Sequence, residues 1–216
     1  MLTRCQRAPG SRMPDIVAVI LAGGAGRRMG GDKPCQRLHG RRLIDIAKAF
    51  AETLDLPFAV AVRGFGQIPD LGAQQILDAD VDGPLGGLLA ALEWANSRRA
   101  EAVITVPCDM PQLPEDLFER LRAENWRRGR PIVAASGGRA HPVCALWPVS
   151  CRETILRYAA TGQRSLNGAL NACGGIKVEW PVLPSDPFAN LNTRGDLESA
   201  AAMIGADAAA HFGAAS

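Results

Sequence analysis

Long hydrophobic runs and closely spaced cysteine pairs are both missing from this chain of 216 residues. No apolar segment approaches the roughly 20 residues that a membrane-spanning helix needs, so we expect no membrane partner. The six cysteines form no C-x-x-C pair and no zinc-finger spacing, which excludes the common cysteine-based metal sites. Isolated thiols without a secretory signal indicate a reducing compartment. The sequence therefore predicts a cytoplasmic protein.

A strong charge imbalance is missing too. The net charge of +2 is too small to indicate nucleic acid as a bulk partner, and no internal repeat indicates a solenoid. Hydrophobic residues make up 47% of the chain and charged residues 21%, which is ordinary for a folded globular protein. We expect a flexible leader at residues 1–14, a single domain at residues 15–204 and a flexible tail at residues 205–216.

Short β-branched apolar runs alternate with segments whose apolar residues recur at helical spacing. Strand patterns occupy residues 15–21, 58–62, 75–77, 101–106, 132–135, 143–147 and 176–180. Helix patterns occupy residues 43–54, 86–96, 114–125, 149–160, 163–173 and 197–204, with Pro114 expected in a first turn and a capping box at Thr193 and Asp196. The alternation predicts a three-layer α/β fold, in which helices cover both faces of a mostly parallel, Rossmann-like sheet. Ligands bind such sheets at the carboxyl ends of strands, so the loops after residues 21, 77 and 106 are candidate sites.

The first of these loops is basic and rich in glycine. It ends the segment AVILAGGAGRRMGGDKP, residues 18–34. It is not a P-loop, because Lys33 is followed by Pro34, and it matches the dinucleotide fingerprint only in part. Glycines let backbone N–H groups approach phosphate oxygens, and Arg28 and Lys33 add positive charge for the same anion. We interpret the loop as a phosphate cradle, with a solvated basic face as the alternative.

A carboxylate follows a later buried strand, in the sequence P-C-D-M-P at residues 107–111. Asp109 in this position can hold Mg²⁺ that bridges phosphate oxygens. Taken alone, Asp109 is better interpreted as a turn residue whose side chain hydrogen-bonds the backbone of its own turn. A phosphate cradle one or two strands away makes a magnesium ligand the better interpretation. We interpret the neighbouring Cys108 as a packing residue, because no histidine base lies near it in the sequence.

Five motifs occur together in this chain. They are L-A-G-G-x-x-x-R-M-G-G-x-K at residues 21–33, G-P-L-G-G at 83–87, P-C-D-M-P at 107–111, H-P at 141–142 and F-x-N-x-N-T at 188–193. The set resembles the molybdenum cofactor guanylyltransferase family, within the nucleotide-diphospho-sugar transferase-like fold, over residues 15–204. The resemblance implies a nucleotidyltransferase that moves GMP from GTP to the terminal phosphate of molybdopterin, with or without bound molybdenum. Pyrophosphate would leave, and the guanine dinucleotide form of the cofactor would result.

The resemblance also implies roles for individual residues. The nucleotide-binding positions are Leu21, Ala22, Gly23, Gly24, Lys33, Asp78 and Asp109. Asp109 would hold the implied cofactor Mg²⁺, and Lys33 and Arg28 would neutralise charge beside it, so that no general base is needed. The pterin-side positions are Asn190, Asn192, His141 and Arg164; for the last two, a structural histidine and a surface cation at a helix start are the alternatives. The implied partners are GTP and molybdopterin, with cofactor-insertion proteins and recipient molybdoenzymes as further candidates.

Rival functions stay open beside this interpretation. A molybdopterin cytidylyltransferase or a sugar-phosphate nucleotidyltransferase would share the fold, whereas a non-catalytic nucleotide-binding module would belong to another class. The presence of both Lys33 and Asp109 speaks against the module, because binding alone would tolerate the loss of the metal ligand. Gly23 favours GTP, since the cytidylyl relatives typically read L-A-A-G there. Where the family often has an asparagine after its second strand, this chain reads Ala-Val-Arg at residues 61–63, so no nucleotide contact is expected there.

Overall fold

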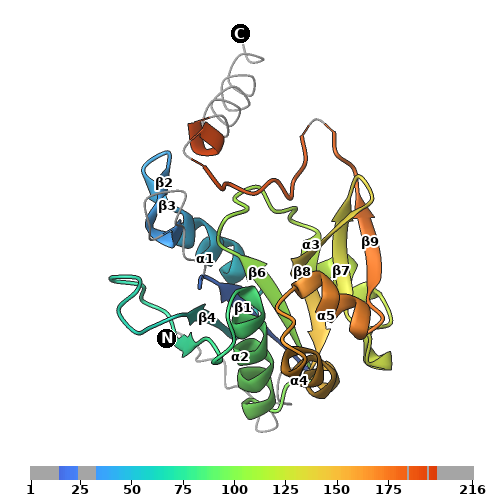
Figure 1. Ribbon diagram of the computed structural model, residues 1–216. Helices are drawn as coiled ribbons and strands as arrows, with labels where there is room; N and C mark the ends of the chain where they lie inside the picture. The colour runs from blue at the N-terminus through green and yellow to red at the C-terminus, as the bar shows by residue number, and fades with distance from the viewer. Residues whose placement is uncertain (1–14, 24–32, 184, 194, 199–216) are drawn as a thin grey trace, which may run out of the picture.

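A sheet of seven strands forms the centre of the molecule (Figure 1), in the order β5-β4-β1-β6-β8-β7-β9. The computed structural model describes residues 15–23, 33–183, 185–193 and 195–198. The strands are β1 (Ile16–Leu21), β4 (Phe58–Val62), β5 (Gln75–Leu77), β6 (Ala102–Pro107), β7 (Ile132–Ser136), β8 (Arg139–Pro148) and β9 (Ile176–Trp180). Strand β8 runs antiparallel to β6 and β7, and the other four neighbouring pairs are parallel. The prediction of a mostly parallel sheet is confirmed.

Helices cover both faces of this sheet. They are α1 (Leu43–Thr53), α2 (Pro84–Ser97), α3 (Leu117–Ala123), α4 (Arg152–Ala160) and α5 (Leu166–Ala172). Val17 and Val19 of β1 pack into the cluster that contains α2, α4 and α5, whereas Ala18 and Ile20 face the side of α1 and α3. Successive side chains of a strand point to opposite faces, so a continuously apolar strand fits between two helical layers. The three-layer architecture is therefore confirmed.

Several element boundaries differ from the predicted ones. The prediction that Pro114 stands in the first turn of a helix is wrong: α3 begins at Leu117, whose N–H closes a turn on the Pro114 carbonyl. Helix α5 begins at Leu166 rather than at residue 163, because the Ser165 hydroxyl caps it by accepting from the Gly168 N–H. The sequence patterns also missed short elements. These are the hairpin of β2 (Arg37–Leu38) and β3 (Arg41–Arg42), and the 3-10 turns η2 (Lys33–Cys35), η3 (Trp126–Arg128) and η4 (Val149–Cys151).

One edge of the sheet collects the loops that the sequence marks as candidate sites. Strand β1 lies between β4 and β6, so the chain reverses its direction of travel across the sheet there, and ligands bind α/β sheets at such a switch point. Residues 185–193, which we call the strap, return from β9 and run over the end of β6 toward β2 and β3 (Figure 1). The strap therefore adds a fourth part of the chain to this edge.

The end of the described chain carries the predicted capping box. The Asp196 N–H donates to Thr193 Oγ1 at 3.1 Å, and the Thr193 N–H donates to Asp196 Oδ2 at 2.8 Å. The predicted leader at residues 1–14, the predicted tail at residues 205–216 and residues 199–204 of the predicted last helix lie outside the described residues. Within the described part of the chain, no helix is long and apolar enough to cross a bilayer.

Candidate active site

Lys33 stands at the centre of the candidate site. Its ammonium donates to Asp109 Oδ2 at 2.6 Å and to Asn192 Oδ1 at 2.8 Å. Lys33 opens the turn η2, Asp109 follows β6, and Asn192 belongs to the strap, so three distant parts of the chain meet here. Only 9% of Lys33 is exposed, and a buried ammonium needs such partners because an unpaired buried charge is costly. The two residues that the sequence pairs for catalysis are thus in direct contact.

Asp78 forms a second polar centre, beside the end of β1. A Cβ added to Gly23 would lie 2.0 Å from Asp78 Oδ2, and one added to Gly87 would lie 3.3 Å from Asp78 Oδ1. The glycines of two separate motifs thus leave room for one carboxylate. Burial raises the pKa of Asp78, and the charge of Arg63 opposes that shift. Asp78 Oδ1 is buried and accepts no hydrogen bond from the described residues, so it is a candidate acceptor for a ligand donor.

A glutamine that the sequence analysis missed holds the backbone between these centres. Gln67 Nε2 donates to the Ala22 carbonyl at 3.0 Å, and Gln67 Oε1 accepts from the Arg63 N–H at 2.8 Å. The Ala22 N–H donates to the Ala61 carbonyl at 3.0 Å, so the peptide groups on both sides of Ala22 are fixed. Gln67 belongs to no motif, and only its two contacts mark it. It ties the loop after β4 to the end of β1. This loop begins at Arg63, the last residue of the segment 61–63, where the family often has an asparagine and this chain has none.

Two of the predicted pterin-side residues, His141 and Arg164, have hydrogen-bond partners within the protein. His141 is 6% exposed, and its Nε2 lies 2.7 Å from the hydroxyl of Ser136, which donates its proton to Asp186 Oδ1 at 2.8 Å. The hydroxyl has one proton, so His141 Nε2–H donates to it. Burial lowers the pKa of His141, with Asp186 opposing, which favours the neutral ring. The Arg164 guanidinium donates to the Ala159 and Gln163 carbonyls at the end of α4. Both side chains thus have structural partners, and their pterin roles stay predictions.

The other predicted positions divide into two groups. Gly24 and Arg28 lie outside the described residues. Leu21 ends β1 beside Gly87, and Asn190 is half-buried in the strap one residue before Leu191. Asn190 therefore lies near the site, although no described contact assigns it a role.

Asp109 offers the ligand chemistry that a magnesium–nucleotide complex needs. Among the described residues, no group of three or more histidine, cysteine, aspartate or glutamate side chains could hold a metal ion. Mg²⁺ commonly binds through one or two carboxylates together with substrate phosphates. The single carboxylate therefore fits an ion that arrives with a triphosphate. Burial and the neighbouring Asp109 raise the pKa of Cys108 to about 12, so its thiol stays protonated, in agreement with the packing interpretation.

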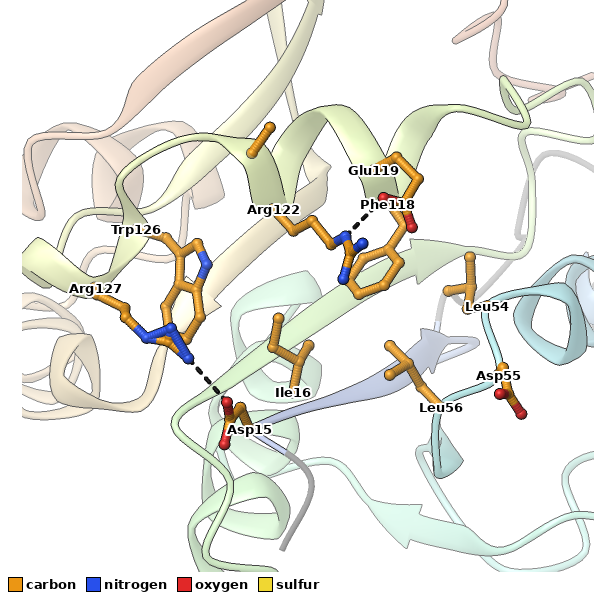
Figure 2. A pocket seen from close by; sticks show the side chains of 11 residues that line it. Asp15, Ile16, Leu54, Asp55, Leu56, Phe118, Glu119, Arg122, Trp126 and Arg127 are labelled. Carbon is orange, nitrogen blue, oxygen red and sulfur yellow. Dashed lines mark hydrogen bonds and ion pairs between the residues drawn. The ribbon is translucent and has the colours of Figure 1, made fainter. Parts of the chain in front are cut away.

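A pocket of about 770 Å³ opens at the opposite edge of the sheet, between the start of β1, the end of α1 and α3 (Figure 2). Figure 2 shows Arg127 paired with Asp15, and Arg122 paired with Glu119. These lining charges neutralise one another, and none of the predicted site residues lines the pocket. Its volume alone therefore does not make it the functional site.

Known proteins are similar to this chain in sequence and in fold. Residues 18–173 match the family model of the MobA-like NTP transferase domain. A molybdenum cofactor guanylyltransferase of Cereibacter sphaeroides is 36% identical over 198 residues, which cover 89% of this chain and 99% of that protein. A protein of the same name from Rhodopseudomonas palustris is 41% identical over 204 residues, which cover 87% and 93%. The chain belongs to the molybdenum cofactor guanylyltransferase family. It is accordingly a nucleotidyltransferase, as the motifs indicate.

Solved structures show the fold of this guanylyltransferase family member. The crystal structure of molybdopterin-guanine dinucleotide biosynthesis protein A from Archaeoglobus fulgidus superimposes with a TM-score of 0.70 at 24% identity, and covers 87% of this chain and 98% of that one. A cytidylyltransferase for 2-C-methyl-D-erythritol 4-phosphate from Thermus thermophilus has a TM-score of 0.63 at 18% identity, with coverage of 87% and 98%. The predicted family and the predicted fold are both confirmed.

Proposed function

We propose that the chain is a GTP:molybdopterin guanylyltransferase. A terminal phosphate oxygen of molybdopterin forms a bond to the α-phosphorus of GTP, the bond from that phosphorus to the bridging oxygen breaks, and pyrophosphate leaves. The observation that carries the proposal is that one edge of the sheet holds both the Lys33–Asp109 pair and Asp78, whose Oδ1 has no hydrogen-bond partner among the described residues. Membership of the guanylyltransferase family supports it.

Asp78 is suited to recognise guanine. Its carboxylate can accept from both the N1–H and the exocyclic amino group of the base, a donor pair that cytosine and adenine do not present in the same geometry. Sites that hydrogen-bond a substrate discriminate better than sites that select on apolar size. Gln67 holds the Ala22 carbonyl and so keeps the backbone beside the base in one arrangement.

The chemistry needs charge neutralisation and alignment rather than a base. The attacking phosphate is already an anion, so no side chain has to remove a proton from it. Two of the three ammonium donors of Lys33 are used by Asp109 and Asn192, and we assign the third to a phosphate oxygen of GTP. Arg28, outside the described residues, would add a second positive charge. Asp109 would hold Mg²⁺, which when bound neutralises charge on the triphosphate.

Pyrophosphate release tests the proposal. The protein is incubated with Mg²⁺ and GTP, with and without molybdopterin, and the product is identified by mass. We expect pyrophosphate and a guanine dinucleotide only when both substrates are present. A non-catalytic module would release no pyrophosphate with either substrate set, and a sugar-phosphate nucleotidyltransferase would release none with molybdopterin. The cytoplasmic location, cofactor-insertion proteins and recipient molybdoenzymes stay predictions.

A further inference from the structure

The strap reaches the nucleotide half of the site through two hydrogen bonds. Asn192 Oδ1 accepts from Lys33 Nζ at 2.8 Å, and the Leu191 N–H donates to the Asp109 carbonyl at 2.9 Å. One bond therefore goes to the ammonium itself, and the other goes to the loop that carries its carboxylate partner. The resemblance to the family implies a pterin-side role for Asn192, but the described contact of its side chain is with Lys33.

Both ends of the strap are held in place. At its start, Asp186 accepts from the Ser136 hydroxyl, and Phe188 stacks on the ring of His141 with 4.8 Å between the ring centres. Phe188 is only 1% exposed, so this end is packed into the core. At its end, Asp196 Oδ2 accepts from the N–H groups of Asn192 and Thr193, both at 2.8 Å. Asn192 therefore presents its side-chain oxygen from a backbone that is fixed before any ligand arrives.

Lys33 needs a second acceptor in order to hold one position. A lysine side chain has many rotamers and loses that freedom only where several contacts fix it. Asp109 alone offers one strong attraction, which fixes a distance but leaves the ammonium free to move around the carboxylate. The Asn192 oxygen supplies a second direction and adds no charge that would oppose an incoming triphosphate. Together the two acceptors define the place of the ammonium.

We propose that Asn192 is a positioning residue, which holds the Lys33 ammonium where it meets the triphosphate of GTP. The inference rests on the proposed function in so far as Lys33 contacts GTP. It predicts that Asn192 acts on nucleotide binding in the absence of molybdopterin and of any divalent metal. A residue that contacts only the pterin would have no effect under those conditions.

A double-mutant cycle on GTP binding tests this inference. Calorimetry in the presence of EDTA, without molybdopterin, gives the GTP dissociation constants of the wild type, Asn192→Ala, Lys33→Met and the double variant. We expect Asn192→Ala to weaken GTP binding about 3- to 10-fold, because it removes a hydrogen bond to a charged group. In the Lys33→Met background the same change should have no effect, since Asn192 acts through Lys33. Asn192→Ser, whose side chain is too short to reach Lys33, should reproduce the loss.

The matched control is Asn171→Ala, which changes an exposed asparagine on α5 and should leave GTP binding at the wild-type value. Unchanged GTP binding in Asn192→Ala, with a raised KM for molybdopterin, would overturn the inference in favour of a pterin contact. Equal losses from Asn192→Ala in both backgrounds would also overturn it, because Asn192 would then touch the nucleotide independently of Lys33. A wild-type protein that does not bind GTP even with Mg²⁺ present would refute the proposed function itself.

Discussion

Replacing Lys33 by methionine removes one positive charge while keeping an unbranched side chain only one atom shorter. The variant loses hydrogen bonds of 2.6 and 2.8 Å. Water partly reaches the pair, since the Lys33 and Asp109 side chains are 11% and 23% exposed, so we expect a loss of stability of about 1–2 kcal/mol. A donor aimed at charge that develops in the transition state contributes more, about 3–4 kcal/mol. The expected result is a kcat lower by about 10²- to 10³-fold, in a protein that still folds.

Steady-state pyrophosphate release at saturating GTP and molybdopterin measures kcat, and thermal melting measures the change in stability. The matched control is Lys48→Met on α1, which removes the ammonium of a half-buried lysine away from the site. Lys48 Nζ donates to the Leu71 carbonyl at 2.9 Å, so this variant should lose some stability and keep its kcat. The reasoning is refuted if kcat of Lys33→Met stays within about threefold of the wild type, or if both variants lose the same activity.

Three further variants probe the other groups of the site. Asp109→Asn should lower kcat by about 10²-fold or more and also lower the melting temperature, because the buried Lys33 ammonium loses its charged partner; near-normal kcat in the folded variant would contradict the metal-ligand role. Asp78→Asn should weaken GTP binding about 10-fold or more, yet raise the melting temperature at pH 7, because burial disfavours the Asp78 carboxylate; wild-type GTP affinity would contradict its role. The pKa of His141 is lowered by burial, so the unfolded chain binds its proton more readily, and the free energy of unfolding should fall as the pH drops below about 6.5. Urea titrations at pH 5.5 and 7.5 should show a smaller pH dependence in His141→Gln, and an equal dependence would contradict the assignment.

Elements with a strong local pattern could be predicted from the sequence. The bounds of β4, β5 and β9 are the predicted ones, because each is a short apolar or alternating run between turn residues. Helix α3 starts later than Pro114 suggests. The residue before it, Asp116, accepts from the Trp180 indole 64 positions away, a contact that no local pattern contains. Strand β8 is longer than the predicted 143–147, because its first residues pair with β7 across an irregular register.

The site could be predicted where a motif marks it and missed where only the fold assembles it. Lys33 and Asp109 could be predicted because their residue types fit phosphate and metal chemistry in the segments that follow buried strands. The F-x-N-x-N motif marks Asn192 as functional, but its contact with Lys33 spans 159 positions and depends on the path of the strap. No sequence motif marks Gln67. Its role follows only from its hydrogen bonds to Arg63 and Ala22, which the fold brings together.

The transfer of GMP rather than CMP to molybdopterin is the central claim, and a competition experiment tests it most directly. One reaction contains equimolar GTP, CTP and ATP with limiting molybdopterin and Mg²⁺, and mass spectrometry quantifies the dinucleotides. We predict that the guanine dinucleotide exceeds the others by about 10²-fold. Gly23→Ala should reduce this excess, because the added Cβ would lie 2.0 Å from Asp78 Oδ2 and displace the carboxylate. Comparable amounts of the cytosine and guanine dinucleotides from the wild-type protein would contradict the account.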